Sequence, residues 1–349
     1  MLCLVSPETM IPKDHPLREI KKITDAVLDH LDDVFDSMYT SRGRPSVPPE
    51  TLLKASILMA LYSVRSERQF CEQLGYNLLF RWFLDMDMTE EPFDASTFSK
   101  NRERMLEFDV SGEFFHLVVQ SCQSGGLMSR EHFTVDGTLI EAWASLKSFK
   151  PKNGPKGPKA GSGSNREENF RGTKRKNDTH ASTTDPEAKL MRKGFGKEAK
   201  LSFSAHALME NRNGLLVDFR IGDAGTSSEW ELGLEMLASV ETGAKPTVAG
   251  DRGYDVSRFV DGCRAHGFTP HVAQKTKHSR IDARTTRHVG YSVSQRIRKR
   301  VEEIFGWTKT FGGFRKTRYR GKQRTQMAAY LVGAAYNMMR AAKLAPSLA

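Results

Sequence analysis

The sequence has few cysteines and no long uncharged apolar stretch. Its four cysteines, Cys3, Cys71, Cys122 and Cys263, are far apart, with no CxxC pair and no histidine at zinc-ligand spacing. We therefore expect reduced, mostly buried thiols. No apolar run reaches the roughly 18 residues that span a bilayer. The N-terminus has no basic start followed by an apolar core, so we expect a cytoplasmic protein with no membrane partner.

A GxxxxGK[ST] phosphate-binding loop is absent as well, which argues against a nucleotide cofactor. Positive charge, in contrast, is abundant and uneven on this chain of 349 residues with net charge +11. Residues 1–100 carry 11 Lys and Arg against 16 Asp and Glu, residues 147–200 carry 15 against 6, and residues 274–324 carry 16 against 3. A basic run is most often a solvated surface. Two such runs beside candidate acids favour nucleic-acid binding, because Lys and Arg neutralise phosphates.

Apolar spacing predicts helices in the first third of the chain. Apolar residues recur at three- and four-residue steps from Leu17 to Val34, and Pro49 can open a second helix. Further helix starts are expected near residues 66 and 94. We predict an all-helical N-terminal domain, residues 1–125, for DNA end binding or dimerisation. Short helices with tight loops also resemble helix-turn-helix readers, but a packing domain fits equally well.

From residue 126 the pattern becomes mixed α/β. Strands are expected at 132–143, 201–209, 215–221, 246–250 and 269–273, with an Asn213-Gly214 hairpin turn, helices at 227–237 and 256–266, a basic helix at 292–310 and a last helix at 324–344. This order predicts a mixed central sheet flanked by helices, residues 126–349. Residues near 148–182, rich in Gly, Pro and Lys, cannot bury enough apolar surface to fold. We expect a basic, disordered insertion there.

Three carboxylates have the setting of a metal site. Asp136 and Asp251 follow β-branched or apolar runs where strands would end, and Glu302 lies on the basic helix. Phosphodiester chemistry is served by two Mg²⁺ ions about 3.5–4 Å apart, held by oxygen ligands. We predict that Asp136, Asp251 and Glu302 are the catalytic ligands of two Mg²⁺ ions, which Mn²⁺ can replace, with Asp136 bridging both.

Each acid also has an ordinary explanation. An Asp before Gly is most often a turn residue, and Glu302 could be a surface acid in an ion pair. Glu303 is an alternative to Glu302. We prefer Glu302 because Arg298 and Lys309, four residues before and seven after it, share its helix face. Glu303 points about 100° away.

Together, these stretches resemble the DDE transposases of bacterial insertion sequences, whose catalytic domain is RNase H-like. The helix motif of one large branch reads Tyr-x2-Arg-x3-Glu-x6-Lys; Arg298, Glu302 and Lys309 fit it, whereas Gln295 stands at the Tyr position. Residues 251–254, Asp-Arg-Gly-Tyr, are similar to the family's Asp-x-Gly-Tyr, and the stretch around Asp136 to its Asp-Gly/Ser-Thr. Residues 42–45 and 94–98 resemble the helical domain of the family-five insertion-sequence group.

The resemblance implies an enzyme that binds terminal inverted repeats and catalyses metal-dependent cleavage and strand transfer. It implies that Asp136, Asp251 and Glu302 are catalytic and that Arg298 and Lys309 contact the transposon end. It also implies double-stranded DNA as the partner, both transposon ends and target, a homodimer, and a nucleoid-associated bacterial protein. A nuclease of the same fold without strand transfer, and a decayed DNA-binding protein, remain alternatives.

Four further residues are weaker DNA-binding candidates from their chemistry alone. An aromatic ring can stack on an unpaired base, although core packing is the more common role for Trp307. Tyr254 could contact a phosphate or cap a strand end. A basic loop would hold the DNA backbone without reading sequence. The candidates are Tyr254, Trp307, Arg315 and Lys316.

Overall fold

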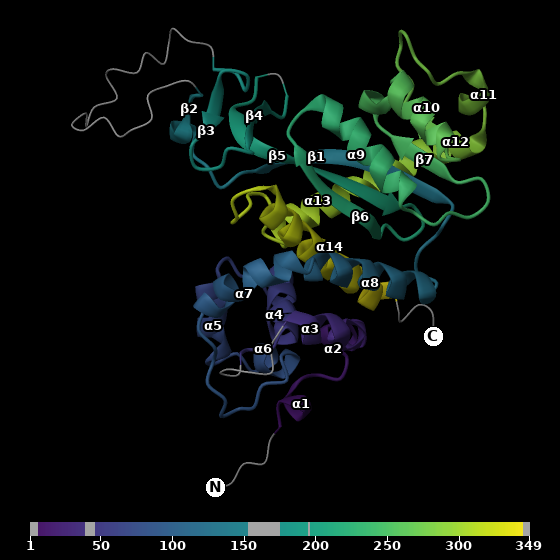
Figure 1. Cartoon of the computed structure of the whole chain (residues 1–349). Coiled ribbons are helices and arrows are strands. Elements are labelled where there is room, and N and C mark those ends of the chain that lie inside the picture. The colour runs from purple at the N-terminus through teal and green to yellow at the C-terminus, as the bar shows by residue number, and fades with distance from the viewer. Residues whose placement is uncertain (1–5, 39–45, 153–174, 195, 345–349) are drawn as a thin grey trace.

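The computed structural model describes residues 6–38, 46–152, 175–194 and 196–344 (Figure 1). Helices come first and a mixed α/β part follows, as predicted. The first part consists of α1 (Pro7–Met10), α2 (Leu17–Leu28), η1 (Asp29–Leu31), α3 (Asp32–Met38), α4 (Pro49–Leu61), α5 (Glu67–Leu74), α6 (Leu78–Phe83), α7 (Ser96–Glu107) and α8 (Val110–Ser124).

The helix starts follow from local capping. The Ser66 hydroxyl accepts a hydrogen bond from the Gln69 amide at 3.1 Å, and the Asn77 side chain accepts one from the Phe80 amide at 3.2 Å. Such caps satisfy amides that the first turn of a helix leaves free. Pro49 begins α4 as predicted, since its missing N–H is not needed there.

The central sheet contains β1 (His132–Glu141), β4 (Lys189–Arg192), β5 (Ala199–Glu210), β6 (Leu216–Asp223), β7 (Thr247–Gly250) and β8 (Thr269–Val272). The strand order is β6-β5-β1-β7-β8, with β4 also beside β5. β5 and β6 form the predicted hairpin, in which Gly214 takes a φ of 75° in the turn, and β5 pairs antiparallel with β1. β7 and β8 run parallel to β1. Three antiparallel strands followed by two parallel ones form the RNase H-like sheet that was predicted.

Helices cover both faces of this sheet (Figure 1). Phe133 and Val135 of β1 pack into a core with α9 (Thr226–Ala238) and α10 (Ser257–Ala265). Ile140, five residues after Val135 and on the opposite face of the sheet, packs with α13 (Val301–Thr310) and α14 (Lys322–Leu344). Side chains alternate along a strand, so residues 133, 135 and 137 point toward α9, and 136, 138 and 140 toward α13.

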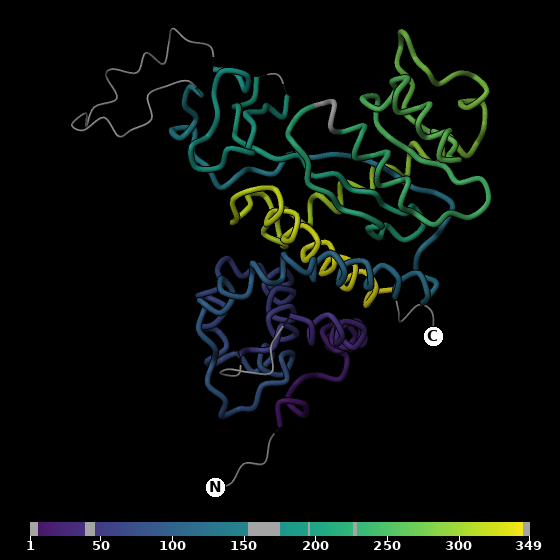
Figure 2. Tube along the Cα trace, in the orientation of Figure 1, coloured from purple at the N-terminus to yellow at the C-terminus, as the bar shows by residue number. Residues whose placement is uncertain are grey.

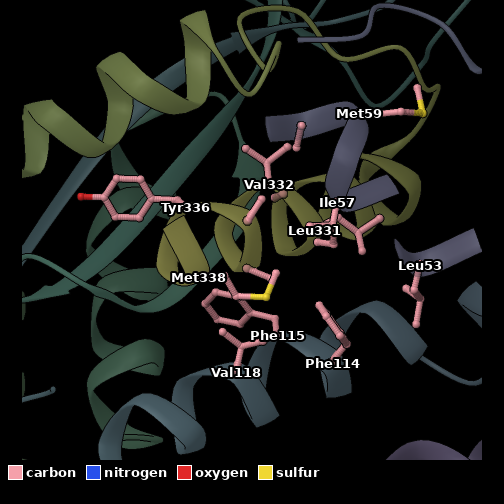
Figure 3. Packing of buried hydrophobic residues seen from close by; sticks show 14 of the residues in the cluster. Leu53, Ile57, Met59, Phe114, Phe115, Val118, Leu331, Val332, Tyr336 and Met338 are labelled. Atoms are coloured by element: carbon pink, nitrogen blue, oxygen red, sulfur yellow. The ribbon is translucent and has the colours of Figure 1, made fainter. Parts of the chain in front are cut away.

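The last helix joins the helical part to the sheet. α14 lies between the sheet and the N-terminal helices in both traces (Figure 1, Figure 2). Leu331, Val332 and Met338 of α14 pack against Phe115 of α8 and Ile57 of α4 (Figure 3). The helical part and one face of the sheet therefore share a single apolar core.

The expectation of a disordered insertion at 148–182 was wrong at its two ends. β2 (Phe149–Pro151) pairs with β3 (His180–Ser182), and Phe149, 3% exposed, stacks on the His180 ring at 5.4 Å. The buried Phe149 ring and the short β2–β3 ladder give both flanks of this stretch a defined structure, which their composition alone did not predict. Residues 153–174 lie outside the described part of the chain.

The predicted continuous basic helix at 292–310 is divided. α12 (Val289–Ile297) is followed by the single turn η4 (Arg298–Arg300) and then by α13, while the short α11 (Ala283–Thr286) precedes them. The thiols of Cys71, Cys122 and Cys263 are free, as predicted; Cys3 lies outside the described residues. Among the helices of the described ranges, none is long and apolar enough to span a membrane.

Candidate active site

Asp136 lies in the middle of β1, not at a strand end as expected, because the strand continues through Gly137 to Glu141; it is half-buried. Its Oδ1 accepts a hydrogen bond from the Gly137 amide at 2.8 Å. Thr138, two residues further on the same face, accepts one from Lys309 Nζ at 2.5 Å. The strand therefore presents an acid and a lysine-bound hydroxyl side by side toward α13.

Asp251 directly follows β7 and stands beside Asp136. β1 and β7 pair in parallel with Thr134 opposite Ala249, so the same register extended by two residues brings Asp251 next to Asp136. Asp251 caps the turn η3 (Arg252–Tyr254), where its Oδ1 accepts from the Gly253 amide at 2.7 Å. Its side chain is exposed, because β7 ends at Gly250 while β1 continues to Glu141.

Glu302 lies in the first turn of α13, exposed, on the helix that packs against β1. Burial, with Lys193 and Arg315 adding to it, lowers the pKa of Lys309 to about 8, whereas the negative charge of Glu302 raises this pKa. The neighbouring Glu303 instead raises the pKa of Tyr336, after the larger effect of burial. The charge of Glu302 thus acts on Lys309 and that of Glu303 on Tyr336 of α14; the choice of Glu302 over Glu303 stays a prediction.

Charge repulsion links the three acids. Burial is the main cause that raises the pKa of Asp136 to about 7, and the charges of Asp251, Glu302 and Glu229 raise it further. Within the described ranges, no group of three or more His, Cys, Asp or Glu side chains is placed so that it could hold a metal ion as it stands. The donors nevertheless fit a divalent cation, because crowded carboxylates supply hard oxygen ligands whose repulsion a cation relieves.

Glu229 of α9 is the member of this group that sequence reasoning missed. The negative charge of Asp251 raises its pKa, after the larger effect of burial. In the sequence Glu229 is one of several acids on an ordinary helix. Only the folded sheet brings it to β1, so no local pattern could have singled it out.

The predicted DNA contacts have different surroundings. Arg315 and Lys316 are exposed on the loop after α13, where the Arg315 carbonyl accepts from the Glu141 amide at 3.1 Å. The Lys316 ammonium stands 5.1 Å from the ring of Trp143, which is 48% exposed. These basic side chains are therefore open to a polyanion at the far end of β1.

The remaining three contacts are less open. Tyr254 is 1% exposed and packs against Phe259, which corrects the prediction that it touches a phosphate. Trp307 packs edge-on against Tyr336 at 5.6 Å, in agreement with a core role rather than a stacking role. Arg298 donates from Nε to Gln295 Oε1 at 3.0 Å, beside the residue that departs from the tyrosine of the motif.

A mixed sheet with three antiparallel strands followed by two parallel ones, and helices on both faces, has the RNase H-like fold. Residues 129–338 match the family model described as Transposase DDE domain, and residues 5–104 match Transposase domain (DUF772). The chain belongs to the DDE transposase family and is a DNA transposase. Membership in this family implies the use of a divalent metal ion.

Comparison with solved structures finds distant similarities only. The piggyBac transposase synaptic complex with hairpin DNA has 9% identity and a TM-score of 0.43, over 95% of this chain and 76% of that one. The Mos1 mariner paired-end complex with Mn has 12% identity and a TM-score of 0.22, over 91% and 86%. The assignment rests on the family models, not on these similarities. No curated protein matches the sequence.

Proposed function

We propose that this transposase binds the terminal inverted repeats of an insertion sequence and uses Asp136, Asp251 and Glu302 to hold two Mg²⁺ ions. The observation that carries the proposal is the placement of the acids: the β1–β7 register brings Asp251 next to Asp136 at the edge where β7 ends, and Glu302 lies on the helix packed against β1. When bound, the ions would activate the attacking oxygen and stabilise the leaving one. Mn²⁺ is expected to substitute.

The chain's own residues position the DNA. Lys309, held by Thr138, brings a positive charge to the acids and offsets their repulsion of a phosphate. Arg315 and Lys316 extend this positive surface along β1, and we assign them to backbone contacts that carry no sequence information. We place Arg298 at the transposon end on the strength of its motif position.

We further propose that the protein acts as a homodimer on double-stranded DNA, because two transposon ends and a target must be brought together. Its place of action would be the bacterial nucleoid, where this DNA lies. Residues 1–125 would serve end binding or dimerisation, and 126–349 catalysis. The similarity of residues 42–45 and 94–98 to the family-five insertion-sequence group supports membership in that group.

The test is incubation of the full chain with DNA that carries the ends flanking its own gene, in Mg²⁺ or Mn²⁺. Wild type should nick these ends and join a pre-cut 3′ end to target DNA. Asp136→Asn, Asp251→Asn and Glu302→Gln should lose both reactions but keep DNA binding. Cutting without joining would indicate a nuclease, and binding without either reaction would indicate a decayed transposase.

A further inference from the structure

The side of β1 opposite Asp136 holds a carboxylate in an unusual position. A Cβ atom on Gly137 would lie 2.6 Å from Glu229 Oε1 and 3.1 Å from His206 Nδ1. The first distance is shorter than any ordinary Cβ contact and the second is tight, so the Glu229 carboxylate occupies the space that a side chain at 137 would fill. Glycine at this position therefore makes room for Glu229 next to Asp136.

Two buried polar side chains beside Glu229 have no partner. His206, paired with Gly137 across β1 and β5, is 0% exposed, and neither ring nitrogen has a hydrogen-bond partner in the described part of the chain. The hydroxyl of Tyr254, 1% exposed, is in the same situation. Buried polar groups are normally hydrogen-bonded, so orphaned groups on two elements around one carboxylate point to a polar ligand or bound water there.

Glu229 also lies within the electrostatic field of the three acids. Asp251 raises the pKa of Glu229, and Glu229 raises those of Asp136 and Tyr254, in each case after burial. The last pair between β1 and β7 is Thr134 with Ala249. Beyond it no described strand lies beside β1 on this side, so no such strand separates Glu229 from Asp251. No Lys or Arg within the described ranges forms an ion pair with Glu229. Glu229 thus adds a carboxylate without an ion-pair partner to the cluster.

We propose that Glu229 belongs to the ligand set of the divalent cation, as a fourth carboxylate that approaches from α9 through the space left by Gly137. This inference rests on the metal assignment made under the proposed function. Asp251, whose charge acts on both Asp136 and Glu229, connects the two sides of the site. His206 and Tyr254 would then face the waters of the bound ion.

The experiment measures Mn²⁺ binding to the full chain without DNA, by calorimetry and by electron paramagnetic resonance of free Mn²⁺. Glu229→Gln removes the charge, and Gly137→Ala displaces the same carboxylate from a different position in the chain. Both should weaken Mn²⁺ binding about 10- to 100-fold, the range seen when groups around a metal are removed. The matched control is Glu231→Gln on the same helix, because Glu231 is paired with Arg258 at 2.8 Å; it should bind like wild type.

Thermal unfolding separates a ligand from a structural residue. Glu229→Gln should raise the melting temperature of the metal-free protein, since it removes repulsion, and should reduce the upward shift that Mn²⁺ causes. A structural Glu229 would instead give a lower metal-free melting temperature and a wild-type Mn²⁺ shift, which would overturn the inference.

Asp136→Asn distinguishes a failure of the proposed metal site from a failure of the proposed role of Glu229. If Asp136→Asn loses Mn²⁺ binding while Glu229→Gln binds within twofold of wild type, the role of Glu229 is wrong and the proposed function stands. If Asp136→Asn itself binds Mn²⁺ like wild type, the metal assignment fails and the inference fails with it.

Discussion

Asp136 is the residue at which burial and charge conflict most strongly. Its pKa of about 7 means that the folded, metal-free protein keeps a proton that the unfolded chain releases near 3.8. Between these values the folded state binds more protons, so stability falls as the pH rises from about 4 to 7. A bound cation would offset this loss, which is the behaviour expected of a ligand rather than of a turn residue.

Asp136→Asn should therefore stabilise the metal-free protein at pH 8, by about 1–3 kcal/mol once partial exposure is taken into account. The gain should be nearly lost near pH 4, where Asp136 is protonated in the folded state and about half protonated in the unfolded chain. Urea unfolding in the presence of EDTA at the two pH values measures it. A difference that does not change with pH would contradict the raised pKa.

The two adjacent glutamates at the start of α13 allow a sharp comparison. Glu302→Gln should reduce metal-dependent DNA cleavage at least about 100-fold, because it removes a direct ligand rather than a neighbouring group. Glu303→Gln should cleave at a rate within about threefold of wild type, since its charge acts on Tyr336 of α14 and is not among the causes that raise the pKa of Asp136. Cleavage rates with a labelled transposon end measure both. Equal losses would contradict the choice of Glu302.

At the scale of elements, periodicity and turn chemistry predicted most of the catalytic domain. The β5–β6 hairpin follows from Asn213-Gly214 and alternating apolar residues, and α9, α10 and α14 were each predicted close to their true bounds. Local signals failed where order depends on a distant partner. The β2–β3 ladder is ordered by Phe149 on His180, which are separated by a low-complexity stretch.

The hairpin turn provides a test of backbone conformation. Gly214 has a φ of 75°, so Gly214→Ala should cost about 1–2 kcal/mol from left-handed strain alone, as its nearest neighbours are 3.9 Å away. The control is Gly306→Ala in the exposed face of α13, where nothing lies within 4 Å. This change should stabilise by roughly 0.5–1 kcal/mol. Urea unfolding at pH 7 compares the two variants. An unchanged free energy of unfolding in Gly214→Ala would contradict the left-handed conformation of Gly214 in this turn.

The same division applies to the site. Asp136, Asp251 and Glu302 could be proposed from the sequence because each stands in a recognisable local motif. Glu229 could not, because its proximity to Gly137 depends on how α9 packs on the sheet. Tyr254 was misassigned for a related reason: an aromatic residue after an aspartate has the same sequence whether its ring turns outward or into the core.

At the scale of the whole molecule, α14 makes the helical part and the sheet one folding unit. Asn337, which is 0% exposed, accepts from the Leu216 amide and donates to the Leu216 carbonyl, both at 2.8 Å. This side chain fixes the start of β6 to a helix that also packs on α8 and α4. Sequence boundaries near residue 125 therefore do not imply independent stability of the two parts.

Asn337→Ala should destabilise the entire chain by about 2–4 kcal/mol, because it leaves a buried N–H and a buried C=O unpaired. Near-ultraviolet circular dichroism and tryptophan fluorescence should report one coincident urea transition, in wild type and variant alike. Two separate transitions would show that the helical part unfolds independently of the sheet.

The most direct test of the central claim is to locate the cation on the chain itself. Fe²⁺ in place of Mg²⁺, with ascorbate and peroxide, cleaves the polypeptide near the bound ion, and mass spectrometry of the fragments identifies the cut positions. The account predicts cuts close to residues 136, 251 and 302, all suppressed by excess Mg²⁺ and by Asp136→Asn. Cuts confined to other regions, or the same pattern in Asp136→Asn, would contradict it.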